Sequence, residues 1–409
     1  MNAILALDLL PQDITLGDVA IILLKVVLIF VVGLVGTMMM VWFERKVISG
    51  MQNRIGPNKA GPVGLLQTLA DGTKLFFKEA LTPARSDKLV YRLAPFLAFV
   101  PAFLVWSVIP LGGDFTNRRD GSFELFGHRT FAQLADPSIG ILLVLAMSSI
   151  AVYGIMLAGW SSGSKYPLLG SVRATAQMIS YEAALGLSLA CVILVSGTLS
   201  TRGIVLNQWT TGRWHLIATG LLPLVVFFIA ATAELNRPPF DLVEAESELV
   251  SGFNTEYSGI SFALFYLAEF MNVITMSGII VTLFLGGPQP LTVNIGSLEW
   301  DGSFGLGALN GTIWFLLKVL VFLYIFVWLR GTLPRLRYDQ LMNLGWKILI
   351  PISLAWFMLL AAFRIGEDRG WNRVVVGAVG LGVILVAGAL LTMANNVATR
   401  NRQREGVMF

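Results

Sequence analysis

The sequence has few charged residues. Of its 409 residues only 13% are Asp, Glu, Lys or Arg, while 56% are hydrophobic. A soluble domain usually carries about 25% charged residues, so this chain has too little polar surface to coat a water-soluble globule. A water-soluble fold is therefore excluded, and the sequence predicts an integral membrane protein.

Residues that hold metals and redox groups are also scarce. The single cysteine, Cys191, can supply neither an intrachain disulfide nor a four-cysteine iron–sulfur site. His128 and His215 fall in loops predicted on the same side of the membrane, which excludes a haem held by two histidines across the bilayer. No Gly-rich loop ending in Lys-Ser or Lys-Thr offers a nucleotide site. We therefore expect no metal site, and electron transfer through this chain would need an organic acceptor.

Apolar runs dominate what is present. Runs of roughly 20 residues can cross a hydrocarbon core about 30 Å thick, and nine such segments stand out, the fifth being the shortest. The sequence thus predicts an all-α polytopic membrane protein. The expected spans are 18–43, 93–110, 139–159, 183–201, 218–233, 259–285, 311–329, 345–363 and 374–394.

The distribution of Lys and Arg predicts the orientation. Segments on the side of the C-terminus hold 19 of the 29 Lys and Arg residues, against eight on the other side. Positive charge is retained on the cytoplasmic side of a membrane. We therefore expect the N-terminus outside and the C-terminus in the cytoplasm of a bacterial inner membrane protein. No basic residue precedes the first apolar stretch, so a cleaved signal peptide is not expected.

One connecting segment, 63–79, has the periodicity of an amphipathic helix. Its apolar residues fall on one face and its charged residues on the other, and Pro62 suits the first turn. It is too short and polar to cross the membrane, so it should lie along the cytoplasmic surface. Packing of the same face on other protein is the alternative. The apolar face comprises Leu66, Leu69, Ala70, Phe76, Phe77 and Ala80.

Three glutamates lie within or at the ends of the predicted spans. Glu269 is near the middle of the sixth span, where an unpaired carboxylate is costly; a purely structural pair with Lys318 is the alternative. Glu234 ends the fifth span, where the helix dipole disfavours an anion. Glu182 opens the fourth span, where helix capping alone could explain it. Clustered carboxylates have raised and coupled pKa values, as a proton relay requires.

Two polar segments on the expected cytoplasmic side add further charge. In 233–257, Pro238 and Pro239 end the preceding span, and acidic residues follow at helical spacing. These are Asp241, Glu244, Glu246 and Glu248, and a solvated helix face would explain them equally well. In 42–62, Glu44, Arg45, Lys46 and Arg54 stand at the mouth of the first span. Such a cluster beside an apolar channel could position a quinone head or bind anionic lipid heads.

Four long stretches carry a family resemblance. They are ERKVISGMQNRIGPNKAGPVGLLQTLADGTKLFFKE (44–79), AGWSSGSKYPLLGSVRATAQMISYE (158–182), AELNRPPFDLVEAESELVSGFNTEYSG (233–259) and LRGTLPRLRYDQLMNLGWK (329–347). The sequence closely resembles the H subunit of proton-pumping NADH–quinone oxidoreductase, respiratory complex I. The match extends over about residues 18–363.

The resemblance implies a role for each matching residue. The first span, the amphipathic helix and the sixth span would frame the quinone entrance. Quinone-binding residues would be Glu44, Arg45, Lys46, Arg54, Asp71, Arg237 and Asp241. Proton-coupling residues would be Glu182, Glu234, Glu244, Glu246, Glu248 and Glu269. Subunit contacts would come from Arg330, Arg335, Arg337 and Asp339.

The resemblance also implies the partners. Menaquinone or ubiquinone would be the substrate, while NADH, flavin and iron–sulfur clusters would belong to other subunits. Those partners are a cytoplasmic quinone-reducing arm, small membrane subunits and antiporter-like pump subunits, together with membrane lipid. Nucleic acid is not expected as a partner.

The chain departs from this family at its end. The family usually has eight spans, whereas here 374–393 adds a ninth with a basic tail. We therefore expect an eight-helix quinone-chamber domain over 1–363 and an additional peripheral helix within 364–409. Three alternatives stay open: the related membrane subunit of a hydrogenase or formate-oxidising complex, a secondary transporter, and a structural anchor. A transporter would show internal repeats and interrupted helices, and no clear repeat is present.

Overall fold

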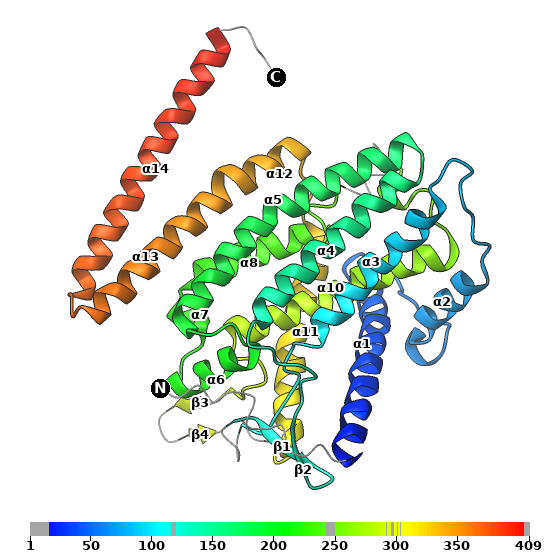
Figure 1. Ribbon diagram of the computed structural model, residues 1–409, viewed down its shortest axis with the longest axis horizontal. Coiled ribbons are helices and arrows are strands. Elements are labelled where there is room, and N and C mark those ends of the chain that lie inside the picture. Colours follow the sequence, from blue (N-terminus) through cyan, green and yellow to red (C-terminus); the bar gives the residue numbers. More distant parts are fainter. Residues whose placement is uncertain are drawn as a thin grey trace.

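Helices make up nearly all of the regular structure (Figure 1). The computed structural model describes residues 16–115, 120–242, 250–291, 293–295, 298–300, 302 and 304–404. Within these residues, eight helices are long and apolar enough to cross a membrane, and α8 is a shorter apolar helix. This confirms the predicted all-α polytopic fold. The major helices are α1 Leu16–Met51, α3 Lys88–Trp106, α4 Gly140–Ser161, α5 Lys165–Ser196, α8 Leu221–Glu234, α10 Gly259–Phe284, α11 Ala308–Thr332, α13 Ile350–Asp368 and α14 Arg373–Arg404.

Shorter elements connect the spans. The helices among them are α2 Gln67–Phe77, α6 Thr201–Thr211, α7 His215–Ala218 and α12 Tyr338–Leu344, with single 3₁₀ turns at Pro62–Gly64 and Gly252–Asn254. A π-helical segment, Gly345–Leu349, joins α12 to α13. Two antiparallel hairpins complete the chain, β1 Ser122–Leu125 with β2 His128–Phe131, and β3 Val293–Ile295 with β4 Leu298–Trp300.

Helix α5 differs most from its predicted span, because it begins at Lys165 rather than near residue 183. Some polar side chains of its first half form hydrogen bonds with neighbouring helices. Gln177 donates to the Ala233 carbonyl at 2.7 Å, and Trp346 donates to Ser180 at 3.1 Å. The helix ends at Ser196 because Gly197 takes a left-handed conformation, with φ of 68°. Hydropathy did not reveal the first half because its polar groups are compensated only in the tertiary structure.

Helix α1 is longer than its predicted span of 18–43. It has 36 residues, which correspond to about 54 Å at 1.5 Å per residue. Glu44, Arg45 and Lys46 therefore lie on its last two turns, not in a loop. A rigid helix rather than a flexible segment holds these charges.

Helix α10 is the centre of the bundle. Its apolar window is 83% buried, the largest share among the described candidate spans, and it contacts α1, α3 and α11. Lys318 of α11 secures its end, donating to the carbonyls of Leu285, Gly287 and Gln289 at 2.7, 3.0 and 2.8 Å. The alternative pairing of Lys318 with Glu269 is therefore wrong, since the lysine binds backbone carbonyls beyond the far end of that helix.

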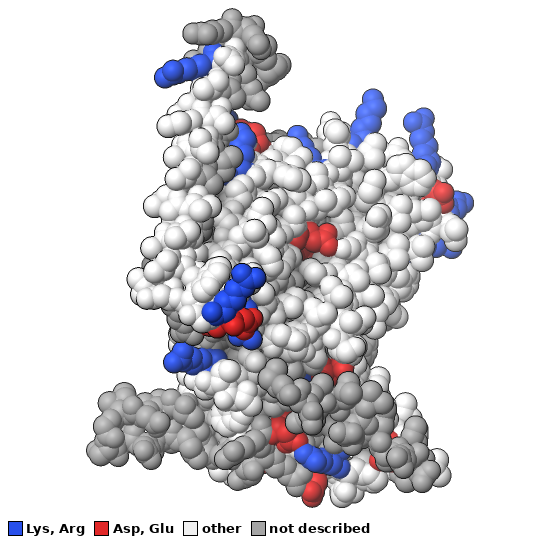
Figure 2. Space-filling view, turned by 60° about the vertical axis from the view of Figure 1, so that its left-hand side comes forward, with Lys and Arg blue, Asp and Glu red and all other residues white. Residues whose placement is uncertain are grey.

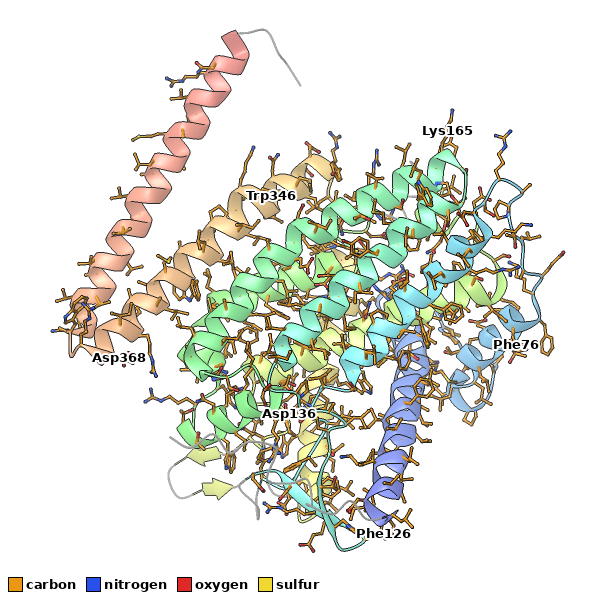
Figure 3. All side chains as sticks on the ribbon, in the orientation of Figure 1. Phe76, Phe126, Asp136, Lys165, Trp346 and Asp368 are labelled. Carbon is orange, nitrogen blue, oxygen red and sulfur yellow. The ribbon has the colours of Figure 1, made fainter. Side chains whose placement is uncertain are left out.

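Helix α2 lies beside the end of α1 and contacts α1 and α10. Its apolar face is open in this chain: Leu69 is 53% exposed and Phe77 81% exposed. Phe76 points away from the bundle at the periphery (Figure 3). The amphipathic helix is thus confirmed over a shorter range than 63–79, and its face does not pack on the described part of this chain.

Among the described elements, α13 is the one with which helix α14 has substantial contact. None of its apolar window is buried. Gly377 and Gly380 face Phe363 and Leu359 of α13, where a larger residue would clash. Beyond this hairpin α14 diverges from the bundle (Figure 1).

The two ends of the bundle are distinct. Lys165 and Trp346 lie at one end, and Phe126, Asp136 and Asp368 at the other (Figure 3). On the face shown in Figure 2, blue side chains lie along the top, and blue and red side chains lie toward the bottom, with a mostly white belt between them, as expected for a surface in contact with lipid. The predicted grouping of these segments into two sides agrees with this placement.

Replacement of Lys318 by Met should destabilise the protein, because three buried carbonyls would lose their donor. We expect a loss of at least about 2 kcal/mol. The measurement is the thermal unfolding midpoint of the chain purified in detergent, together with its accumulation in membranes. Lys347→Met is the matched control, because Lys347 is exposed. Equal midpoints for the two variants would contradict the assigned role.

Candidate functional site: a buried charge network with polar cavities

Four charged residues from distant parts of the chain meet near the C-terminus of α1, at one end of the bundle. Glu44 of α1 accepts from Arg237 at 2.8 Å and also from Arg330 of α11. The Nε atom of Arg237 is 3.0 Å from Oε1 of Glu269 in α10. Arg237 thus bridges two carboxylates, and the network joins α1, α10, α11 and the segment after α8.

Arg237 is the centre of this network. It is only 5% exposed, and its guanidinium carbon lies 4.5 Å from the centre of the Phe270 ring. Burial by itself lowers the pKa of the guanidinium, but the charges of Glu269 and Glu44 outweigh it, so the pKa is raised. Arg237 therefore carries a permanent positive charge between two carboxylates.

Two further ion pairs flank the network. Arg335 contacts buried Asp241 at 3.2 Å, and Arg45 contacts Asp71 of α2 at 2.7 Å. Gln67 also donates to Asp71 at 3.2 Å. The pair between Arg45 and Asp71 ties the amphipathic helix to α1, so this helix is positioned beside the buried charges.

The remaining predicted residues lie outside the network. Arg54 is exposed, and its Nε donates to Gln52 at 2.7 Å. Lys46 is half-buried on the last turns of α1. Arg337 and Asp339 are exposed at the start of α12. The other predicted acids, Glu244, Glu246 and Glu248, lie outside the described residues.

Two serines of α4 link the deeper glutamates. Ser148 donates to Glu234 at the end of α8, and the next residue, Ser149, donates to Glu182. Glu182 lies in the middle of α5, not at its start. Its interpretation as a helix cap is therefore wrong, because the helix begins 17 residues earlier than this glutamate. The two carboxylates instead flank α4.

One cavity connects Glu234 with the charge network, and a second cavity lies on the other side of Glu234. A cavity of about 60 Å³ is lined by Asp241, Glu269 and Glu234, and a second, of about 30 Å³, by Glu234, Ser148 and Thr275. A water molecule needs about 10–15 Å³ of such volume, so both cavities can hold water. Glu234, which is shared by the two, stands between them.

Asparagine side chains in the cavity walls were not among the predicted site residues. Asn272 lines both cavities, and Asn236 and Asn254 line the larger one. The buried carbonyl oxygen of Asn254 has no hydrogen-bond partner in the described structure, which a water molecule would satisfy. Asn272 could have been found, because it follows Glu269 by three residues on the same helical face. Asn236 and Asn254 gave no such signal, since Asn236 lies beyond the end of α8 and Asn254 in a single 3₁₀ turn.

These features define a polytopic membrane protein in which buried and half-buried carboxylates extend from a charge network along water-sized cavities. Among the described residues, no group of three or more His, Cys, Asp or Glu side chains could hold a metal ion.

Comparison with known proteins identifies the family. A profile of the NADH dehydrogenase family matches residues 24–361. The chain is 50% identical over 378 residues to the H subunit of NADH-quinone oxidoreductase from Frankia casuarinae, covering 91% of this chain and 78% of that protein. It is 46% identical over 393 residues to the corresponding protein of Cutibacterium acnes, which has the same name, covering 92% and 85%. The chain therefore belongs to the NADH dehydrogenase family, as the sequence resemblance predicted.

Replacement of Arg237 by Lys should weaken the network, although the charge is kept. A single ammonium group cannot reproduce the planar guanidinium, which donates to Glu44 through Nη1 and forms an ion pair with Glu269 through Nε. We expect a loss of about 1–3 kcal/mol, measured as a lower thermal unfolding midpoint in detergent.

Arg45→Lys is the matched control for this substitution. Arg45 is 41% exposed in its pair with Asp71, and an exposed pair contributes less than about 1 kcal/mol. If Arg45→Lys lowered the midpoint as much as Arg237→Lys, burial would not be what gives Arg237 its role.

Proposed function

We propose that this chain is the membrane subunit of a proton-pumping NADH–quinone oxidoreductase, forming the quinone entrance and coupling quinone reduction to proton movement. The observation that carries the proposal is the network of buried Glu44 and Arg237 with partly exposed Glu269, which adjoins the cavity that Glu234 also lines. Charge that changes at this network can act on Glu234 through a short, water-accessible path. The relatives, which are named as H subunits of NADH-quinone oxidoreductase, support the assignment.

Quinone enters between α1, α2 and α10 in this proposal. The open apolar face of α2 and the exposed flank of α1 offer a surface to the isoprenoid tail, and Arg45 and Asp71 lie where the two helices meet. The head group moves toward Glu44, Arg237 and Asp241. Arg54, Lys46 and the partners supplied by other subunits complete the entrance.

The redox groups belong to other subunits. NADH, flavin and iron–sulfur clusters reside in a peripheral arm that docks at the end of the bundle bearing Arg335, Arg337 and Asp339. The substrate is menaquinone or ubiquinone. Small membrane subunits and antiporter-like pump subunits complete the complex.

Proton coupling follows the carboxylates. Reduced quinone takes up protons as well as electrons, which alters the charge beside Arg237 and Asp241. The cavity waters transmit the change to Glu234, and the adjacent hydroxyls of Ser148 and Ser149 link Glu234 to Glu182. Glu244, Glu246 and Glu248 extend this path in the segment after Asp241. Proton transfer then continues into the pump subunits.

The placement in the membrane is part of the proposal. The N-terminus faces outward and the C-terminus the cytoplasm of a bacterial inner membrane, because the basic segments gather at the end that holds the charge network. Residues 1–363 form the quinone-chamber domain. Residues 364–409 add a peripheral helix, which lies beyond the family match that ends at residue 361.

Glu234→Gln should uncouple the enzyme. An amide cannot exchange a proton between the two cavities, so proton pumping should fall by about a hundredfold or more, the lower end of the range for loss of a proton-transfer group, while quinone reduction persists. The measurement compares both rates in proteoliposomes holding the assembled complex. Glu367→Gln, at the opposite end in the exposed pair with Arg364, is the control. Normal pumping in the Glu234 variant would remove this residue from the path.

Arg54→Ala tests the entrance. NADH-driven quinone reduction should fall or lose inhibitor sensitivity, because the mouth of the first helix loses a cation that positions the head group. NADH oxidation by a hydrophilic artificial acceptor should persist, because the peripheral arm is unaltered, and co-purification of the subunits confirms beforehand that the complex is assembled. Unchanged quinone kinetics would place the head-group path away from Arg54.

A further inference from the structure

A large apolar groove lies between α1 and α11. Its volume is about 740 Å³, and its walls are α1 and α11, with Ile274 of α10 at its base. From Lys25 to Phe43 it follows α1 for 18 residues, or about 27 Å. That length nearly equals the thickness of the hydrocarbon core, about 30 Å. The groove therefore lies within the lipid-facing part of the protein.

The chemistry of the groove walls limits what can occupy the groove. The walls are almost entirely aliphatic and aromatic, so water would find no partners there. Flexible hydrocarbon chains fit both the volume and the chemistry.

A single charge stands at one end of the groove. Lys25 is the only charged residue among the described residues that line it. Its Nζ donates to Thr130 at 3.1 Å, and no carboxylate forms an ion pair with it in the described structure. An ammonium group has three donors, so two can bind a further acceptor. An anionic head group supplies that acceptor and compensates the charge.

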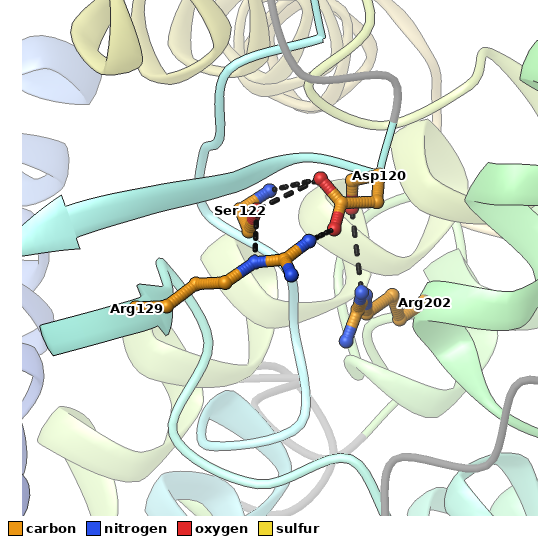
Figure 4. Close-up of polar contacts among 4 residues, drawn as sticks. All are labelled: Asp120, Ser122, Arg129 and Arg202. Atoms are coloured by element: carbon orange, nitrogen blue, oxygen red, sulfur yellow. Dashed lines mark hydrogen bonds and ion pairs between the residues drawn. The ribbon is translucent and has the colours of Figure 1, made fainter. Parts of the chain in front are cut away.

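The charged end of the groove is held in place by the β1–β2 hairpin. Arg129 forms an ion pair with Asp120 and donates to Ser122 at 3.0 Å, and Arg202 donates to the Asp120 carbonyl at 3.4 Å (Figure 4). Burial by itself raises the pKa of Asp120, but the hydrogen bonds from Ser122 and the charge of Arg129 outweigh it, so the pKa is lowered and the carboxylate stays charged.

This cluster also fixes the groove wall. The Arg202 guanidinium lies 3.2 Å from the centre of the Phe131 ring, and Phe131 lines the groove beside Thr130. His128 of the same hairpin is 2.7 Å from Asp18 of α1. The hairpin is thus tied to both α1 and α6, and Thr130 and Phe131 are positioned before any ligand binds.

The geometry points to a binding site for one anionic phospholipid, with its phosphate at Lys25 and its acyl chains along α1 and α11. The lipid belongs to the leaflet on the side of the β1–β2 hairpin. The site is separate from the entrance beside α2, because it lies between α1 and α11. It does not depend on the function proposed above.

Photo-crosslinking in lipid nanodiscs tests the site. The chain, with the subunits that purify with it, is reconstituted with phosphatidylglycerol or phosphatidylcholine that carries a diazirine on an acyl chain. Phosphatidylglycerol should label the groove about fivefold more than phosphatidylcholine. Helix α14 is the internal control, because its apolar surface is exposed and should be labelled equally by the two lipids.

Two substitutions separate the head-group and acyl-chain contacts. Lys25→Gln should abolish the preference for phosphatidylglycerol, and Val32→Trp, which fills the groove, should abolish groove labelling by both lipids. Val31→Trp is the matched control, because Val31 is exposed on α1 but does not line the groove. It should leave labelling unchanged.

Three results would overturn the proposal. Equal labelling of the groove by both lipids in the unaltered protein would show annular lipid only. A preference that survives Lys25→Gln would remove the head-group contact. Labelling of the groove by an azido-quinone probe but not by phosphatidylglycerol would assign it to the quinone tail.

Discussion

The bridge that Arg237 forms between Glu44 and Glu269 is the interaction on which the arrangement of the site depends. It places charge from α1 and α10 on one guanidinium that follows α8, and Arg330 brings in α11. Charges so deeply buried are tolerated only when they are paired. The four segments cannot separate without exposing unpaired charge, so the position of α10, and with it Glu269 and Asn272, is tied to that of α1.

The same constraint sets what the site can do. Because Arg237 remains protonated, a change of charge near Glu44 or Asp241 is not absorbed by the arginine and must be balanced elsewhere. The nearest groups that can exchange protons are carboxylates lining the two polar cavities, and Glu234 faces both. In the ground state the charges of the network compensate one another. Reduction of a quinone disturbs this balance, and the disturbance is the physical basis of the proposed coupling. The apolar groove with Lys25 lies between α1 and α11, where a lipid would support the helix without entering this path.

Much of the fold was predictable from the sequence. The positions of the nine apolar helices follow from hydropathy, because a bilayer about 30 Å thick demands long uncharged runs. The amphipathic character of 67–77 follows from its periodicity. The predicted helix ends were less accurate than the predicted helix positions: α1 continues to Met51 and α5 starts at Lys165. Polar residues in these turns, such as Gln177, form hydrogen bonds with other helices, and a linear pattern does not reveal such partners.

For the candidate site, the sequence determined which residues could carry charge in the membrane: Glu182, Glu234, Glu269 and the basic positions of the connecting segments. Composition and family resemblance suffice for that. An ionisable group is costly to bury in a membrane span, so such a residue is rare there and easily recognised in the sequence. Only the tertiary structure decided the partners. Glu269 pairs with Arg237 rather than Lys318, and Arg330 and Arg335 bind carboxylates of this same chain. The reason is geometric, since ion pairing requires contact within about 4 Å, and residues far apart in sequence meet at that distance only after the helices have packed.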